Sequence, residues 1–180
     1  KLITNIMESN IMKKTLIIFG SKTDEKVYNE IAKELKKQKV DFDLRVSSAH
    51  KTPEDVDNIL QNDYAVVIAG AGLAAHLPGV VAAKVISPVI GVPCVGNYQG
   101  LDALLAIAQM PPGIPVLAVG VNKGEIAAQN CAKMMKKYES VTLIGNNSEA
   151  TKKAVDILKS FNVMHIFDSK PNPKTVNIQF

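Results

Sequence analysis

The 180-residue chain has no tryptophan, two cysteines, three histidines and one arginine, Arg45. Cys94 and Cys131 lie far apart and form no Cys-x-x-Cys pair, which excludes a disulfide framework and a cysteine zinc cluster. Such sparse cysteine is typical of a reduced, cytoplasmic protein. Aromatic residues make up only 5% of the chain and are not interleaved with basic residues, so we expect no nucleic-acid partner.

Long apolar runs are also missing. The most apolar stretch, residues 70–96, is interrupted by His76, Lys84 and three prolines, whereas a membrane-spanning helix needs ~20 consecutive apolar residues. We therefore expect no membrane contact and interpret this stretch as buried core. Residues 1–11 lack the apolar run and cleavage site of a secretory signal, so we interpret them as a leader or an expression remnant.

What is present is enough apolar material for a folded core, since 47% of the residues are hydrophobic and the net charge is only +4. Short strands without polar alternation belong to a parallel sheet covered on both faces. With crossover helices between them they predict an α/β fold, a three-layer doubly wound parallel sheet of the flavodoxin-like kind. The predicted strands are 15–19, 42–46, 65–69, 89–92 and 116–119, and the predicted helices are 24–38, one opening at 53, 74–85, 101–109 and 125–138.

The strand–helix–strand pattern runs once more after residue 139, with predicted strands at 141–144 and 163–167 around a helix at 148–161. We predict a single domain over 12–168, followed by a C-terminal tail or arm at 169–180. Residues 145–149 are weakly similar to residues 20–24. We attribute this to the residue types common at any strand–loop–helix connection rather than to a second binding site.

Ligands of such sheets bind beyond the carboxyl ends of the strands, and three segments are predicted to lie there. The first, residues 20–24, offers the hydroxyls of Ser21 and Thr23 and the carboxylate of Asp24 at a helix start that favours anions. Asp24 is placed to accept hydrogen bonds from sugar hydroxyls. Simple helix capping by Thr23 or Asp24 explains the same residues. The Gly-Lys-Ser/Thr ending of a nucleotide-triphosphate loop is absent.

The second segment, residues 47–53, contains Ser48 and Lys51, which suit a phosphate, and His50, a residue type that titrates near neutral pH. An ordinary surface turn remains the alternative.

The third segment, residues 69–79, contains Gly70, Ala71 and Gly72, whose small side chains let a ligand approach the backbone. It also contains His76 beside Leu77, and a lone histidine in apolar surroundings is usually a core residue. Two histidines on two strand-end loops of one sheet favour a shared crevice instead.

Other motifs are absent: there is no nucleophile elbow, His-Glu-x-x-His, nucleotide loop or dinucleotide fingerprint. We interpret Cys94 and Cys131 as core residues and His165 as structural. The remaining chemistry is acid–base catalysis by imidazole on a small phosphorylated substrate, without a metal or cofactor.

Taken in order, these segments resemble the family of N5-carboxyaminoimidazole ribonucleotide mutases and aminoimidazole ribonucleotide carboxylases of purine biosynthesis. The resemblance runs from about residue 16 to about residue 138. The family pattern Gly-Ser-x-Ser-Asp is similar to residues 20–24, Ser-Ala-His-Arg-Thr-Pro to residues 48–53, and Ala-Gly-x-Ala-Ala-His-Leu-Pro-Gly to residues 71–79. Residues 88–93, 109–111 and 113–116 also fit the family.

The resemblance implies that Ser21 and Asp24, with Thr23 beside them, bind the ribose phosphate and that Ser48 and Lys51 help at the phosphate. It implies that His50 is the general acid and base, and that the loop from Gly70 to Leu77, with His76, lines the pocket for the carboxylate or CO2. The implied enzyme is a cytoplasmic, cofactor-free isomerase of IMP biosynthesis that moves a carboxylate from N5 to C4 of the ribonucleotide. Family members are homo-octamers with sites near subunit boundaries.

Three departures from the family pattern bear on this expectation. Lys51 stands where the mutase branch has arginine and is similar to the carboxylase branch, which uses CO2 directly, although residues 74–79 resemble the mutase branch. Leu73 replaces a glycine. Ala103 and Ala106 stand where serines are common.

We expect the mutase, with the direct carboxylase as the close alternative. A non-catalytic flavin or nucleotide module is disfavoured by the scarcity of aromatic residues and by the missing acid pair of response regulators. A purely structural assembly subunit is disfavoured by the two polar histidine loops.

Overall fold

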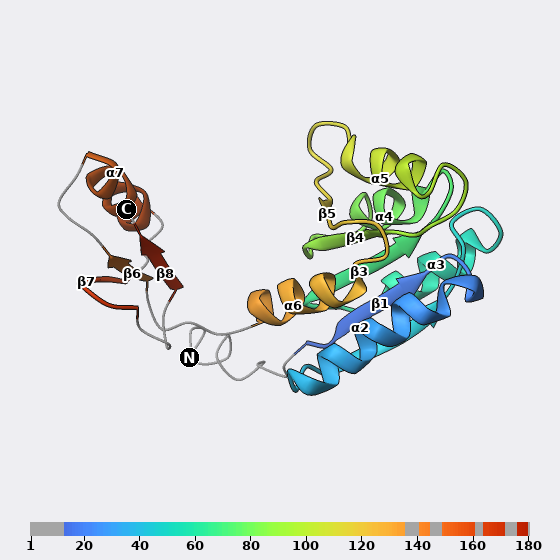
Figure 1. Cartoon of the computed structure of the whole chain (residues 1–180), viewed down its shortest axis with the longest axis horizontal. Helices are drawn as coiled ribbons and strands as arrows, with labels where there is room; N and C mark the ends of the chain where they lie inside the picture. Colours follow the sequence, from blue (N-terminus) through green and yellow to red (C-terminus); the bar gives the residue numbers. More distant parts are fainter. Residues whose placement is uncertain (1–12, 136–140, 145–148, 161–163, 172–175, 180) are drawn as a thin grey trace. The chain divides into compact units, whose positions relative to one another are not determined.

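The computed structural model describes residues 13–135, 141–144, 149–160, 164–171 and 176–179 (Figure 1). The chain divides into two compact units, one ending at Met135 and the other beginning at Lys136.

The first unit is built on five parallel strands. They are β1 (Thr15–Phe19), β2 (Phe42–Val46), β3 (Val66–Ala71), β4 (Val89–Pro93) and β5 (Leu117–Ala118), in the order β2-β1-β3-β4-β5. The chain goes outward from β1 to β2 and then returns past β1 to β3, so the strand order reverses between β1 and β3. This is the doubly wound, flavodoxin-like order, and it confirms the predicted fold class.

Helices cover both faces of this sheet (Figure 1). One face packs against α2 (Glu25–Lys37), which follows the 3-10 turn η1 (Lys22–Asp24), and against α6 (Gly124–Met135). The other face packs against α3 (Pro53–Leu60), α4 (His76–Ala82) and α5 (Leu101–Ala108). Among the described residues, no helix is both long enough and apolar enough to cross a membrane.

The two-faced covering explains why the central strands are almost entirely apolar, the exception being Thr15 in β1, whose hydroxyl lies 3.2 Å from Cys131 Sγ. In β1, Ile17 and Phe19 belong to the core on the α2 and α6 side, whereas Leu16 and Ile18 belong to the core on the α3, α4 and α5 side. All four side chains are fully buried. Because successive strand residues point to opposite faces, a strand with two buried faces needs apolar residues at every position.

The second unit has its own sheet of three parallel strands. It contains β6 (Val141–Ile144), α7 (Glu149–Ser160), β7 (His165–Asp168) and β8 (Val176–Gln179), with the strand order β7-β6-β8. The boundaries therefore differ from the expected single domain over 12–168 with a tail at 169–180, since β8 lies within that tail. Periodicity cannot show whether a further strand extends one sheet or begins another, which accounts for the difference. The expected leader, residues 1–11, lies outside the described residues.

The contact between α2 and α6 generates a stability prediction. A Cβ atom added at Gly124 would lie 2.8 Å from the backbone oxygen of Val27 and 2.9 Å from Ile31 Cγ1, so Gly124→Ala forces the two helices apart. We expect a loss of about 1–3 kcal/mol in the free energy of unfolding, measured by urea denaturation. In the control Gly120→Ala the added Cβ meets only the flexible Lys123 side chain at 3.1 Å, and we expect a change within about 0.5 kcal/mol. Equal stability of the two variants would contradict the prediction.

Candidate functional site

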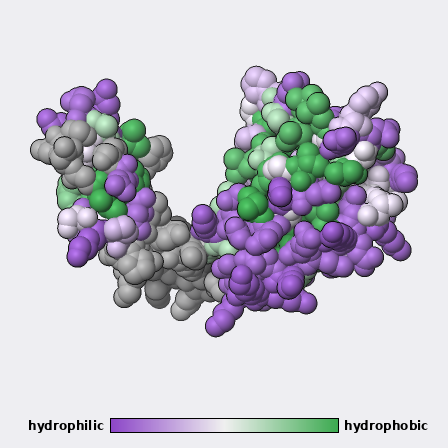
Figure 2. Space-filling model, viewed as in Figure 1, coloured by the Kyte–Doolittle hydropathy of each residue, from purple (hydrophilic) through white to green (hydrophobic). Residues whose placement is uncertain are grey.

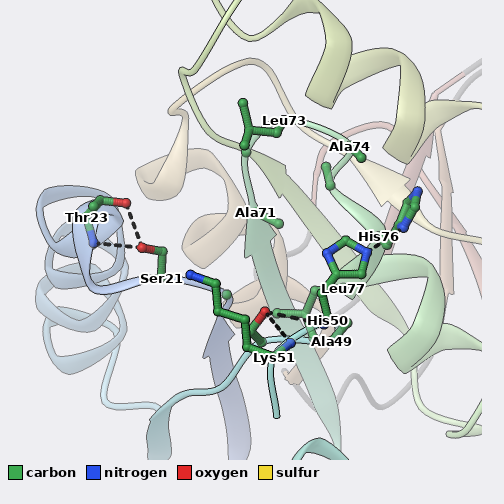
Figure 3. Close-up of a pocket in the computed structure, with 14 residues that line it drawn as sticks. Ser21, Thr23, Ala49, His50, Lys51, Ala71, Leu73, Ala74, His76 and Leu77 are labelled. Atoms are coloured by element: carbon green, nitrogen blue, oxygen red, sulfur yellow. Dashed lines mark hydrogen bonds between the residues drawn. The ribbon is translucent and has the colours of Figure 1, made fainter. Parts of the chain in front are cut away.

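A cavity of about 340 Å³ opens at the carboxyl ends of β1, β2 and β3, beside the point where the strand order reverses (Figure 3). The strands end together because Phe19 is in register with Val46 on one side and with Gly70 on the other. The lining residues are Gly20, Ser21, Thr23, Ser48, Ala49, His50, Lys51, Ala71, Gly72, Leu73, Ala74, Ala75, His76 and Leu77.

The loop after β1 presents a serine hydroxyl. Ser21 is the N-cap of the 3-10 turn, and its Oγ accepts hydrogen bonds from the Thr23 backbone N–H at 3.1 Å and from the Thr23 hydroxyl at 2.8 Å. Both bonds use lone pairs of the Ser21 oxygen. The Ser21 hydroxyl proton is therefore available to donate to an anion in the cavity. The expected capping by Thr23 or Asp24 is wrong, since Ser21 is the capping side chain and Asp24, at the N-cap of α2, makes no capping hydrogen bond with its side chain.

The loop after β2 is built in the same way. Ser48 Oγ accepts from the backbone N–H groups of His50 and Lys51, each at 3.3 Å, so its proton also remains available. The Thr52 side chain closes the loop, because its Oγ1 accepts from the Ser48 backbone N–H at 3.0 Å and lies 2.9 Å from Ser47 Oγ. In Figure 3 the Lys51 side chain extends toward the Ser21 loop and brings a positive charge to this side of the cavity.

The loop after β3 forms the apolar wall. Ala71, Ala75 and Leu77 are buried, and Leu73 and Ala75 adopt left-handed backbone conformations with φ of 55° and 41°. Residues other than glycine rarely adopt this backbone conformation, and each one that does costs about 1–3 kcal/mol of folding free energy. The turn is held by the Ala75 N–H, which donates to the Gly72 carbonyl at 3.0 Å. The strained turn carries the chain from β3 directly into α4 and places His76 at the first position of that helix.

His50 and His76 meet inside this site. His50 Nε2 lies 2.7 Å from His76 Nδ1, and the rings are T-shaped, with centroids 4.8 Å apart and planes 74° apart. Both side chains are exposed to the cavity mouth. Figure 3 shows the other ring nitrogen of His50 turned away from His76 and toward the side of Ala71 and Ser21. The two histidine loops thus open into one crevice.

Asp24 is half-buried and does not line the cavity; its carboxyl lies near the side chains of Thr23 and of Cys94, the residue after β4. Burial raises the pKa of the Asp24 carboxyl above its ordinary value of 3.8, and the polar side chains of Cys94 and Thr23 partly oppose the shift. Burial, together with the negative charge of Asp24, raises the pKa of the Cys94 thiol to about 12. The thiol therefore stays protonated at neutral pH, and it donates its proton to the Val92 carbonyl oxygen at 3.7 Å.

Nine of the eleven residues expected at the site line this cavity; Asp24 and Gly70 do not. Gly70 is buried in β3, where an added Cβ would lie 2.1 Å from the Phe19 ring, so it is required for packing.

Cys94 and Cys131 are buried, as expected for core residues. The proximity of Cys94 to Asp24 is not predicted by the residue pattern, although the position of Cys94 directly after a strand is a usable signal. In the described parts of the chain, no group of three or more His, Cys, Asp or Glu side chains could hold a metal ion.

The chain was compared with known proteins. The family model for AIR carboxylase matches residues 14–143, a span that includes all three loops of the cavity. The chain belongs to the AIR carboxylase family. Within this family it is 55% identical over 134 residues to a Methanocaldococcus jannaschii protein named N5-carboxyaminoimidazole ribonucleotide mutase, covering 68% of this chain and 85% of the relative.

A Pyrococcus abyssi protein of the same name is 49% identical over 136 residues, covering 72% of this chain and 78% of the relative. Among solved structures, the crystal structure of Treponema denticola PurE has a TM-score of 0.63 and 27% sequence identity, covering 82% of this chain and 88% of that chain. The AIR carboxylase family assignment therefore rests on both sequence and fold.

The raised pKa of Asp24 generates a pH prediction. A raised pKa favours the protonated carboxyl in the folded chain, so its contribution to stability is present below pH 3.8 and is lost as the pH rises through the raised value. The stability of Asp24→Asn relative to wild type should therefore increase between about pH 3 and pH 6, as measured by urea midpoints.

Asp43→Asn provides a comparison of opposite sign. The Lys14 ammonium, through its hydrogen bond, lowers the pKa of the Asp43 carboxyl, so the contribution of Asp43 is present above pH 3.8 and is lost as the pH falls. The relative stability of Asp43→Asn should decrease over the same pH range. Parallel trends in the two variants would contradict the assignment.

Proposed function

We propose that this protein is an N5-carboxyaminoimidazole ribonucleotide mutase, an isomerase of purine biosynthesis that moves the carboxylate from N5 to C4. The observation that carries the proposal is the meeting of His50 and His76, 2.7 Å apart, in a cavity that also contains hydroxyl donors and a lysine. Membership of the AIR carboxylase family and the names of its mutase relatives support the same activity.

The anion-binding side of the cavity would hold the ribose phosphate. Ser21 and Ser48 have hydroxyl protons left to donate, and Lys51 supplies a positive charge. Thr23 contributes by donating its own hydroxyl proton to Ser21, which leaves the Ser21 proton for the anion. Asp24 does not line the cavity itself but directly follows Thr23, which does, and we propose that its carboxylate accepts from ribose hydroxyls. Gly70 contributes by allowing the close packing of β3 on Phe19 rather than by contacting the substrate.

His50 would transfer the protons. Protonation of N5 by His50 accompanies cleavage of the N5–carboxylate bond, which releases CO2 and leaves the amine. C4 then attacks CO2 with its electron pair, and His50 removes the C4 proton to restore the aromatic ring. One histidine that gives and then takes a proton balances the cycle.

The apolar wall would retain CO2 between the two steps. Ala71, Ala75 and Leu77 are at most 9% exposed and have no hydrogen-bonding side chains, so water in the space beside these three side chains would find few hydrogen-bond partners. Gly72 has no side chain, so the backbone is open to the ligand there. An added Cβ would lie 3.4 Å from the Cys94 carbonyl oxygen.

The direct carboxylase is the second candidate, because Lys51 retains the charge of arginine but not its two-pronged donor geometry. A proton NMR time course separates the two candidates. We expect rapid conversion of the N5-carboxylated ribonucleotide and slow conversion of the uncarboxylated ribonucleotide with low bicarbonate. The reverse order of rates would establish the carboxylase.

The role of His50 can be tested by His50→Asn. We expect kcat to fall by about 10²–10⁴-fold or more, because the proton carrier is lost, whereas binding of the ribonucleotide product, followed by calorimetry, is retained. His165→Asn is the matched control, since His165 lies in β7 and does not line the cavity. Full turnover by His50→Asn would refute the proposed role.

We further propose that the protein is cytoplasmic and assembles as a homo-octamer with sites near subunit boundaries. The support for assembly is an α5–β5 apolar patch, defined as Val95, Tyr98, Leu101, Leu105 and Leu117, which are 47–81% exposed. The support for the location is the small number of cysteines. Leu101 and Leu105 share one face of α5, being four residues apart. Figure 2 shows hydrophobic residues gathered over α4, α5 and β5, whereas the region of α2 is hydrophilic. Apolar surface of this kind marks association sites.

Leu105→Lys tests the assembly. We expect wild-type protein to have a mass of about eight times 19.4 kDa by light scattering after size exclusion, and the variant to dissociate because a charge enters an apolar contact. The control Ile126→Lys alters a residue of α6, on the other face of the sheet, that is 44% exposed. Dissociation of the control alone would contradict the proposed patch.

A further inference from the structure

The contact between the two histidines assigns a role to His76 that goes beyond lining the cavity. The 2.7 Å distance from His50 Nε2 to His76 Nδ1 requires one proton between the two nitrogens, since two bare nitrogens or two N–H groups would repel each other. The nitrogens of an imidazole point in divergent directions. Engaging Nε2 with His76 therefore leaves Nδ1 of His50 for the substrate, on the side where Figure 3 shows that nitrogen.

We infer that His76 is a positioning residue that acts through His50, fixing the ring and exchanging a proton with its Nε2 so that His50 Nδ1 can give and then take a proton. This inference rests on the proposed function. It assigns to His76 no contact with the reacting atoms.

The histidine pair can lose and regain one proton without breaking its hydrogen bond. With three protons on the four ring nitrogens, the pair is a monocation: His50 Nδ1 has one, His76 Nε2 has one, and the third lies between the rings. Donating the Nδ1 proton to N5 leaves a neutral pair, with the shared proton on His50 Nε2 and Nδ1 bare. The bare Nδ1 then accepts the C4 proton, and the monocation returns. The hydrogen bond persists in both states, so neither ring has to turn during the cycle.

The surroundings of His76 support a positioning role. Its backbone begins α4 directly after the left-handed Ala75, whose side chain is buried, so the ring starts from a fixed point. Leu77 and Pro78, the next two residues, are also buried and anchor the first turn of the helix. The imidazole itself is exposed, which leaves His76 Nε2 access to water for proton exchange.

The experiment combines nitrogen NMR with kinetics on the full-length protein. The chain has only three histidines, so ¹⁵N-histidine labelling gives a simple spectrum that His50→Asn and His165→Asn assign. We expect a scalar coupling across the hydrogen bond between His50 Nε2 and His76 Nδ1. We also expect His50 to change its balance of bare and protonated nitrogens in His76→Phe, which keeps a planar ring but has no nitrogen.

In the kinetic arm, His76→Phe should lower kcat roughly 100-fold with KM little changed, since general acid–base catalysis contributes about 10²–10⁴-fold and depends on the correct tautomer. His76→Asn, whose amide can replace Nδ1, should recover part of that loss. A raised KM with unchanged kcat would overturn the inference, as would a wild-type spectrum without the coupling. The NMR arm needs no substrate, so an inactive wild-type enzyme with an intact coupling would reject the proposed function and leave the histidine pair standing.

Discussion

The pocket depends on the parallel pairing of β1 with both β2 and β3. Because the register places Phe19 level with Val46 and with Gly70, the three strands end together and their loops emerge side by side. Backbone bonds continue the pairing past the strands, since Gly20 N–H donates to the Gly70 carbonyl and Ser47 N–H donates to the Phe19 carbonyl. A register shift of one residue would turn the side chains of a strand to the opposite face and separate the loops.

The sequence predicted much of this. Three central strands that are apolar throughout indicate a sheet with two covered faces, and ligand sites of such sheets lie at strand ends, so the order of elements and the three loops could be found without coordinates. The bounds of β1, β2 and β6 are as predicted. The helix after β3 is shorter than predicted, because Ala74 and Ala75 have good helix propensity but lie in a turn that the left-handed backbone of Ala75 ends.

Other features depend on three-dimensional contacts that no local pattern contains. The hydrogen bond between His50 and His76 joins residues on different loops, and the direction of each ring follows from the turn before it. Asp24 resembles a cavity residue in sequence but does not line the cavity, and its charge raises the pKa of Cys94, whose apolar neighbours in sequence indicate only burial. The strands of the second unit pair with one another rather than with the first sheet, and this pairing cannot be read from the sequence because their strand–helix–strand spacing resembles that of the first unit.

Every residue that lines the cavity lies between positions 20 and 77, within the first three strands and the loops that follow them. The later elements of the same unit, from β4 to α6, contribute buried support and outward-facing surface but no side chain to the cavity. The side chains of the cavity and those of the α5–β5 apolar patch are thereby encoded in separate stretches of one polypeptide. Mutation can remodel the outer surface of α5 and β5 without altering any side chain that lines the cavity.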